Sequence, residues 1–362
     1  MRDSMASNVT RDLAIIAAVF IFATVLLYGY IAWYTPEGME TVYRNWDGPA
    51  YVVVARSMYD SKIIHALPKL PGIDRPSYYA QEFPLYPVFI RMFAFIGYEQ
   101  SMIFVSLLFS LLFIFACYFL IHEVEPTANA LVVSLLLIYY VPRWFVVSHV
   151  GSSEPVFLFF LVMCWHFFYR KRYTLSAVCL AAAQLARLSG AFFFAGFLLY
   201  GVLRQRSLRN LLPYFIAPAA LGALFLFYGL RFGDVYIELK EYALHPITHW
   251  PPFINFFHPE GYYDVWKEGL LLLHLLYAVA IGILIQKKQY VLSLTSLPYY
   301  LYLFFVHHSD MSRYLLPLLP LVAIAFAPAL SKKAVYIPML LFVPVIFMIA
   351  LSYISYNVAG VL

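Results

Sequence analysis

The stretch RNWDGPAYVVVA at residues 44–55 places a carboxylate where it could do chemistry. Asp47 stands beside Trp46, shortly after an apolar run, Leu13–Tyr34, that is long enough to cross a membrane. An Asp in this position can be the N-cap of a short helix over 48–59. It can also be a general base that accepts the proton of an acceptor hydroxyl. The sequence leaves both interpretations open, and we carry the second forward, with Trp46 and Tyr51 as candidate substrate contacts.

Two further carboxylates follow. In QEFPLYP (81–87), Glu82 is either a second carboxylate of the site or a solvated loop charge, and Tyr86 is a natural anchor at a membrane surface. In SHVGSSEPVF (148–157), Glu154 precedes Pro155 at the mouth of an apolar run. The helix dipole alone favours a Glu at a helix start. The competing interpretation is that Glu154 orients an acceptor or the hydroxyls of a donor sugar.

Three arginines lie at the ends of apolar runs: Arg143 in VPRWF, Arg187 in QLARLSG and Arg313 in HHSDMSRYLLP. A charge near membrane depth is costly and marks a functional position by default. A guanidinium matches phosphate geometry with two parallel hydrogen bonds, so these residues are candidates for binding a lipid phosphate. The alternative for Arg187 is that its side chain merely reaches back to the membrane surface.

The same C-terminal stretch holds His307 and His308, followed by Asp310. Imidazole and carboxylate are common metal ligands, but no third ligand accompanies them at a regular spacing. We therefore predict no metal site and no cofactor, and assign the two histidines to substrate binding. Cys117, Cys164 and Cys179 lie singly in apolar segments, which favours small core residues over a disulfide or thiolate site.

The composition determines which elements must position these residues. The chain has 362 residues, of which 63% are hydrophobic and 12% charged, with a mean hydropathy of +0.77. A soluble domain of this size needs a largely polar surface, so these values exclude one. They predict an all-α, polytopic transmembrane helix bundle.

Eleven apolar runs are candidate spans. The clusters RKR (170–172), RQRSLR (204–209), KK (287–288) and KK (332–333) follow every second run. By the positive-inside rule these ends are cytoplasmic, which leaves the N-terminus inside and the C-terminus outside. The predicted spans are 13–34, 101–121, 127–141, 155–169, 174–188, 190–203, 211–230, 265–285, 290–306, 314–330 and 335–356.

With this topology one face carries the chemically mixed connections, and we expect the active site there. The outer stretches are 35–100, 142–154, 231–264 and 307–313. In the first, FPLYPVFIRMFAFIG (83–97) contains Arg91 and is too short in apolar positions to span, so it predicts a helix lying in the membrane plane. The aromatic-rich second large loop, 231–264, is expected to rest on the bilayer. We predict a single transmembrane domain over 1–362 in a prokaryotic cell membrane, with the active site facing outward.

These motifs, in this order, resemble those of the C-type (GT-C) glycosyltransferase superfamily, and most closely the PIG-V-like mannosyltransferases. The resemblance rests on five motifs and covers roughly residues 40–205 and 313–320. The motifs are WDGPAY (46–51), FPLYPVFIR (83–91), SSEPVFLFFL (152–161), ARLSG (186–190) and RYLLPLLP (313–320).

The resemblance implies transfer of a hexose, with mannose the first candidate, from a polyprenyl (dolichyl) phosphate donor to an acceptor hydroxyl. It implies inversion at the anomeric carbon and a catalytic carboxylate that maps onto Asp47. The implied partners are a lipid, glycan or protein acceptor and membrane lipids, and nucleic acid is not among them. Many relatives carry paired acidic residues in the first outer loop, whereas Asp47 is followed by Gly48, which favours a metal-independent reaction. Arg187 and Arg313, with Arg143, would stabilise the charge on the departing phosphate.

Two other classes of protein compete with a transferase. A lipid or solute transporter would carry charges through the span interiors, and here only Gln184, Arg187 and His274 interrupt them. A non-catalytic subunit of a membrane assembly would be indifferent to the loss of Asp47. The sequence does not name the acceptor.

Overall fold

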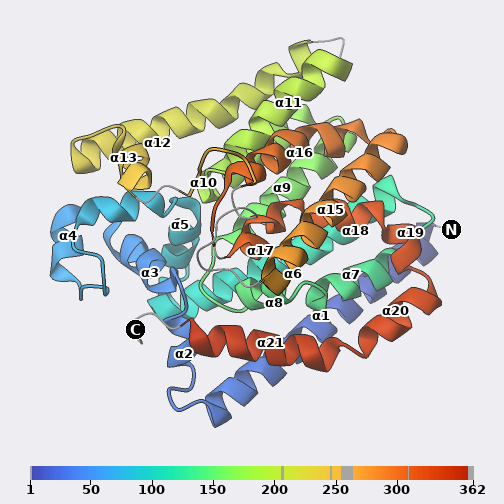
Figure 1. Ribbon diagram of the computed structural model, residues 1–362, viewed down its shortest axis with the longest axis horizontal. Helices are drawn as coiled ribbons and strands as arrows, with labels where there is room; N and C mark the ends of the chain where they lie inside the picture. Colours follow the sequence, from blue (N-terminus) through green and yellow to red (C-terminus); the bar gives the residue numbers. More distant parts are fainter. Residues whose placement is uncertain (1, 205–207, 245–246, 254–263, 309, 358–362) are drawn as a thin grey trace. The chain divides into compact units, whose positions relative to one another are not determined.

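The computed structural model describes residues 2–204, 208–244, 247–253, 264–308 and 310–357 (Figure 1). In these ranges the regular elements are helices, and the one exception is an isolated antiparallel bridge between Thr248 and Val306. The predicted all-α class is therefore confirmed. By its contacts the chain, predicted as one domain, divides into two compact units. The first contains Met1–Pro76, Pro84–Phe159 and Ala327–Leu362, and the second contains Ser77–Phe83 and Phe160–Phe326.

The first unit is built around long apolar helices. Residues 13–34 contain no proline and few polar side chains, so a single helix, α1, runs through them. In Figure 1, α21 lies beside α1 and α8, and α6 packs on α7. The helices are α1 (Arg2–Tyr34), α2 (Glu40–Tyr43), α3 (Gly48–Ser57), α4 (Ser61–Ala66), α5 (Leu85–Met92), η2 (Ala94–Ile96), α6 (Tyr98–Val124), α7 (Ala130–Tyr139), α8 (Pro142–Ser148), α19 (Ala327–Leu330), α20 (Lys333–Leu340) and α21 (Val343–Tyr356), and α9 (Glu154–Tyr169) begins here.

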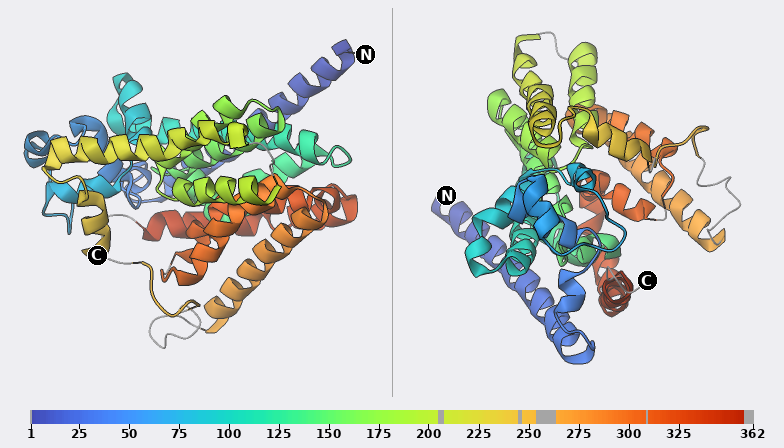
Figure 2. Two further views of the ribbon diagram at one scale, coloured as in Figure 1. Left: turned by 90° about the horizontal axis from the view of Figure 1, so that it is seen from above. Right: turned by 90° about the vertical axis from the view of Figure 1, so that its left-hand side faces the viewer.

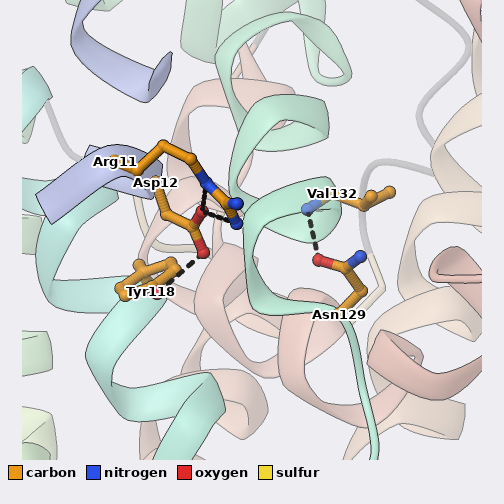
Figure 3. A network of polar contacts seen from close by, with 5 residues as sticks. All are labelled: Arg11, Asp12, Tyr118, Asn129 and Val132. Atoms are coloured by element: carbon orange, nitrogen blue, oxygen red, sulfur yellow. Dashed lines mark hydrogen bonds and ion pairs between the residues drawn. The ribbon is translucent and has the colours of Figure 1, made fainter. Parts of the chain in front are cut away.

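Polar contacts join several helix ends of this unit at one place. The Tyr118 hydroxyl of α6 donates to Asp12 of α1 over 3.1 Å, and Asn129 accepts from the Val132 amide as the N-cap of α7 (Figure 3). The Asn129 amide in turn donates to the hydroxyl of Ser331 over 2.7 Å. The first part of α1, the last part of α6, the start of α7 and the residue that follows α19 therefore lie together.

The predicted spans all fall on helices in the described part of the chain. Four helices are long and apolar enough to cross a membrane, or six spans result if each of two bent pairs counts as one; five shorter apolar helices carry the remaining runs. The four are Asn8–Tyr34, Tyr98–Val124, Leu212–Phe232 and Lys267–Gln286.

Two predictions about connections need correction. Residues 142–154 were expected as an outer loop, but 142–148 form α8, which turns by 79° from α7 and is buried from Arg143 to Ser148. Pro142 causes the turn, because the residue before a proline disfavours helical geometry. The predicted in-plane helix over 83–97 is two short pieces, α5 and η2. Arg91 of α5 donates to the carbonyls of Ala55 and Arg56 (3.0 and 3.1 Å), which lie in the last turn of α3. These bonds explain why a charge stands in the middle of an apolar segment.

In the second unit α11 packs closely on α16. A side chain at Gly196 would overlap the backbone of Thr295, and the Trp165 indole donates to the Thr295 hydroxyl over 2.9 Å. Helix α15 runs beside α16 and α18 (Figure 2). The elements are η1 (Pro76–Gln81), most of α9, α10 (Tyr173–Ala186), α11 (Gly190–Arg204), η3 (Leu208–Asn210), η4 (Leu212–Phe215), α12 (Ile216–Phe232), α13 (Ile237–Leu244), α15 (Asp264–Gln286), α16 (Tyr290–Tyr302), η5 (Leu303–Phe305), α17 (Met311–Tyr314), η6 (Leu316–Leu318) and α18 (Leu319–Ala325). Residues 254–263 of the predicted loop 231–264, and 205–207 of the predicted basic cluster, lie outside the described residues.

Candidate active site

Asp47 stands immediately before α3, as the sequence predicts. It occupies the N-cap position with φ −80° and ψ −2°, but its side chain makes no capping hydrogen bond. Pro49, in the first turn, has no amide hydrogen to offer, and the Asp47 carbonyl accepts the first helical bond, from Tyr51, over 3.0 Å. The half-buried Asp47 side chain therefore does not cap its own helix.

The loop that carries Asp47 is fixed by the end of α21. The Asn45 side chain donates to the carbonyl of Ile354 over 2.7 Å, and the Trp46 amide donates to the carbonyl of Asn357 over 3.1 Å. Trp46 has φ 45°, which a residue with a side chain rarely adopts and which persists only where its surroundings hold it. These bonds position the residue next to Asp47.

Arg143 lies against the same loop. Its guanidinium carbon is 4.8 Å from the centre of the Trp46 ring and 4.1 Å from that of Tyr353 in α21, and its side chain is buried. Two aromatic faces stabilise a cation without neutralising it. The structure thus brings one of the three predicted phosphate-binding arginines to the residue beside Asp47.

A second network connects α3 to the predicted SSE motif. The Tyr51 hydroxyl shares a hydrogen with Ser153 over 2.8 Å, and the Tyr51 and Tyr86 rings meet edge to face with centres 4.9 Å apart. The Tyr86 hydroxyl contacts the Met102 carbonyl (2.9 Å) and accepts from the Ser152 amide (3.1 Å). Burial raises the pKa of Tyr86 well above its usual value, so the phenol remains a hydrogen-bond donor.

The same network reaches Glu154, which begins α9 and is buried. The Ser152 hydroxyl donates to the Glu154 carboxylate. The stretch WDGPAY (46–51) and the loop before Glu154 also meet through their backbones. A side chain at Gly151 would come within 2.8 Å of the Gly48 Cα. The loop before Glu154 and the start of α3 after Asp47 are thus in direct contact. Trp46, Asp47, Tyr51, Tyr86, Arg143 and Glu154 all belong to the first unit.

The remaining predicted residues belong to the second unit. Arg187 follows the last residue of α10, where the chain turns back, and Gly190 begins α11 so close to Gln184 that no side chain fits. Its guanidinium lies within electrostatic reach of the Tyr302 hydroxyl. Glu82 is buried. Burial of Tyr79, together with the negative charge of Glu82, raises the pKa of the Tyr79 hydroxyl.

Arg313 lies in α17, directly after the histidine pair. The His307 amide donates to the carbonyl of Ile247 over 2.7 Å, which ties this stretch to residues 247–253, and His308 accepts from the amide of Asp310 over 3.0 Å. The rings of His308 and Tyr314 are 5.2 Å apart. In the described part of the chain, no group of three or more His, Cys, Asp and Glu side chains is arranged to hold a metal ion.

Several of these contacts have no local signal in the sequence. Tyr353 contacts Arg143 and Asn357 contacts Trp46, and nothing in the sequence around Tyr353 and Asn357 indicates these partners. Ser152 and Ser153 were quoted as part of a motif without a role, although two serines before a buried Glu are a signal for its hydrogen-bond partners.

No family model and no curated protein matches the chain. Solved structures do. The oligosaccharyltransferase of Archaeoglobus fulgidus in the apo form superposes with a TM-score of 0.57 at 11% identity, covering 95% of this chain and 56% of that one. The same enzyme in complex with Zn and sulfate gives 0.52 at 14% identity, covering 94% and 53%.

ArnT from Cupriavidus metallidurans in the apo state gives a TM-score of 0.54 at 14% identity, covering 87% of this chain and 59% of that one. The chain therefore spans somewhat more than half the length of these structures. Its apolar helices and these likenesses make it an integral membrane protein with the GT-C fold.

Proposed function

We propose that this protein is a membrane glycosyltransferase of the GT-C superfamily. It transfers a hexose, with mannose the first candidate, from a polyprenyl or dolichyl phosphate donor to an acceptor hydroxyl, with inversion and with Asp47 as the general base. The reaction takes place on the outer face of the membrane and needs no metal. The PIG-V-like mannosyltransferases are the sub-family to which we assign it.

One observation carries the proposal: the carboxylate of Asp47 does not cap α3, and the residue beside it stacks on a buried arginine. A carboxylate that merely ended a helix would bond the second or third amide of that helix. An acid group on a loop and a cation packed against that loop suit a reaction in which a proton is removed at one atom and negative charge grows at another.

The atoms of the reaction balance as follows. Asp47 takes the proton of the acceptor hydroxyl, whose oxygen forms a bond to the anomeric carbon of the sugar. The bond between that carbon and the phosphate oxygen breaks, and both its electrons leave with the lipid phosphate. Arg143, Arg187 and Arg313 are the proposed cations for the departing phosphate, which needs no proton once its charge is stabilised. Glu82, Glu154, His307 and His308 are proposed contacts of the sugar and acceptor.

The test is transfer of label by the purified protein. Radiolabelled polyprenyl-phosphate mannose is added with a membrane lipid extract, with EDTA in one arm, and a parallel reaction contains the detergent alone. We expect labelled product with protein in both arms, and the product identifies the acceptor class. If no sugar from a panel of polyprenyl-phosphate donors moves, the protein is a transporter or an assembly subunit instead.

A further inference from the structure

A buried acidic residue that the mechanism does not use lies on α13 (Ile237–Leu244). The Glu238 side chain is 3% exposed, and its Oε2 has no hydrogen-bond partner in the described part of the protein. Leaving a buried acceptor unsatisfied costs about 1–3 kcal/mol, and more when the group is charged. A buried residue that lowers the stability of the fold is a candidate for ligand binding, because function is a reason to keep such a residue.

The surroundings of Glu238 connect it to the second group of site residues. Tyr242 is four residues further on and hence on the same face of α13. Its hydroxyl meets that of Tyr302 over 3.2 Å, and Tyr302 lies within electrostatic reach of Arg187. The only basic residue of the helix, Lys240, is bonded to Asp234. Burial raises the pKa of Glu238 to about 7.

The charge of this group restricts what it can bind. A carboxylate is an acceptor only, and it repels a phosphate. Tyr242 and Tyr302 connect this carboxylate to Arg187, which we assign to the donor phosphate. The part of the donor that the carboxylate can bind is therefore the sugar, whose hydroxyls are donors. We therefore propose that Glu238 binds hydroxyl groups of the donor sugar, next to the lipid phosphate at Arg187. This inference rests on the proposed function and adds to it a residue that selects the sugar.

A substitution by Gln separates this role from a structural one. Gln keeps the shape of the side chain and removes the charge. The pKa of the buried acid is raised, so folding loses stability as the pH rises from the unfolded value near 4.5 to about 7. At pH 8 that cost is complete. The neutral Glu238→Gln protein should therefore unfold at the same temperature as wild type or higher.

The experiment measures binding to purified protein in detergent at pH 8. The ligands are a short-chain polyprenyl-phosphate mannose and the same polyprenyl phosphate without sugar. We expect Glu238→Gln to bind the mannose donor at least about 10-fold more weakly, and the sugar-free lipid as wild type does. Glu238→Asp, which keeps the carboxylate, should bind the donor with intermediate affinity. Glu241→Gln is the matched control, because Glu241 is equally buried on the same helix and should leave both affinities unchanged.

The outcomes distinguish the two claims. If wild type binds the mannose donor and Glu238→Gln binds it equally well, Glu238 does not contact the sugar and the inference is overturned. A similar loss for both lipids in Glu238→Gln also overturns it, because such a loss reports a structural role. If wild type itself does not bind the mannose donor, the failure belongs to the proposed function.

Discussion

At the scale of single residues, Arg143 shows how a positive charge is held inside the protein. Trp46 and Tyr353 cover its guanidinium from two sides, at 4.8 and 4.1 Å. Aromatic faces offset part of the cost of removing a cation from water. A guanidinium can form two parallel hydrogen bonds to a phosphate, and we propose that Arg143 does so with the donor.

Replacing Arg143 should weaken the use of the donor. We expect Arg143→Gln to lower kcat/KM for the polyprenyl-phosphate sugar by about 10- to 100-fold, because charge-assisted bonds to a phosphate are lost. Arg143→Lys should fall between this variant and wild type, since lysine keeps the charge but not the planar stack. The control is Arg44→Gln, which changes an exposed arginine that pairs with Glu40 in the loop that carries Asp47. An Arg143→Gln enzyme as active as Arg44→Gln would exclude Arg143 from the site.

The residue types of the site were predictable where their signal is local. Asp47 and Glu154 each stand at a helix start, which the sequence indicates through the prolines that follow them, Pro49 and Pro155. The structure begins a helix at both places. Contacts made across the fold, such as Asn45 with Ile354, depend on which helices pack together. A single sequence does not show which helices pack together, so the contacts of Arg143 with Trp46 and Tyr353 could not be predicted.

At the scale of elements, the apolar runs predicted the helices well and their bends poorly. Run length and hydropathy indicate where a helix lies, because every backbone group in a membrane must be bonded within its own segment. A buried turn such as that between α7 and α8 breaks the run without changing its composition. Pro142 marks the point where the direction of the chain changes between α7 and α8.

The contact between Gly151 and Gly48 is the element-level link between the two predicted carboxylates. Gly151→Ala should push the start of α3 away from the loop before Glu154, because the new methyl group would lie 2.8 Å from the Gly48 Cα. We expect a loss of about 1–3 kcal/mol in unfolding free energy and a lower kcat. Gly29→Ala in α1 of the same unit is the matched control, since nothing lies within 4 Å of its new methyl group. Equal thermal stability and kcat for both variants would show that the contact does not position Asp47.

At the scale of the whole molecule, the distribution of basic residues predicts which side of the membrane each connection faces. Within the first unit, Asp12 and Asn129 lie near one another (Figure 3), and the Asn129 amide donates to the hydroxyl of Ser331. Elsewhere in this unit Asn45 meets Ile354, and Asn357 follows α21. We predict from the basic clusters that the end of the unit with Asp12, Asn129 and Ser331 is cytoplasmic.

Labelling of single cysteines in intact cells tests the orientation. Glu37 and Lys333 are exposed, and the native Cys117, Cys164 and Cys179 are buried, so background labelling should be low. We expect Glu37→Cys to react with a membrane-impermeant maleimide in intact cells and Lys333→Cys to react only after permeabilisation. The reverse pattern would place the N-terminus outside and the proposed active site on the cytoplasmic face.

The most direct test of the central claim compares wild type with Asp47→Asn in two assays on the same preparations. One assay is steady-state transfer from the polyprenyl-phosphate donor, and the other is binding of that donor. Removing a general base without removing the site should lower kcat by about 10²- to 10⁴-fold while the donor affinity stays as in wild type. Glu40→Gln, a change to an exposed acid shortly before Asp47, should alter neither value. An Asp47→Asn protein that transfers sugar as fast as wild type would contradict the account, and Glu82 and Glu154 would then be the candidates for the base.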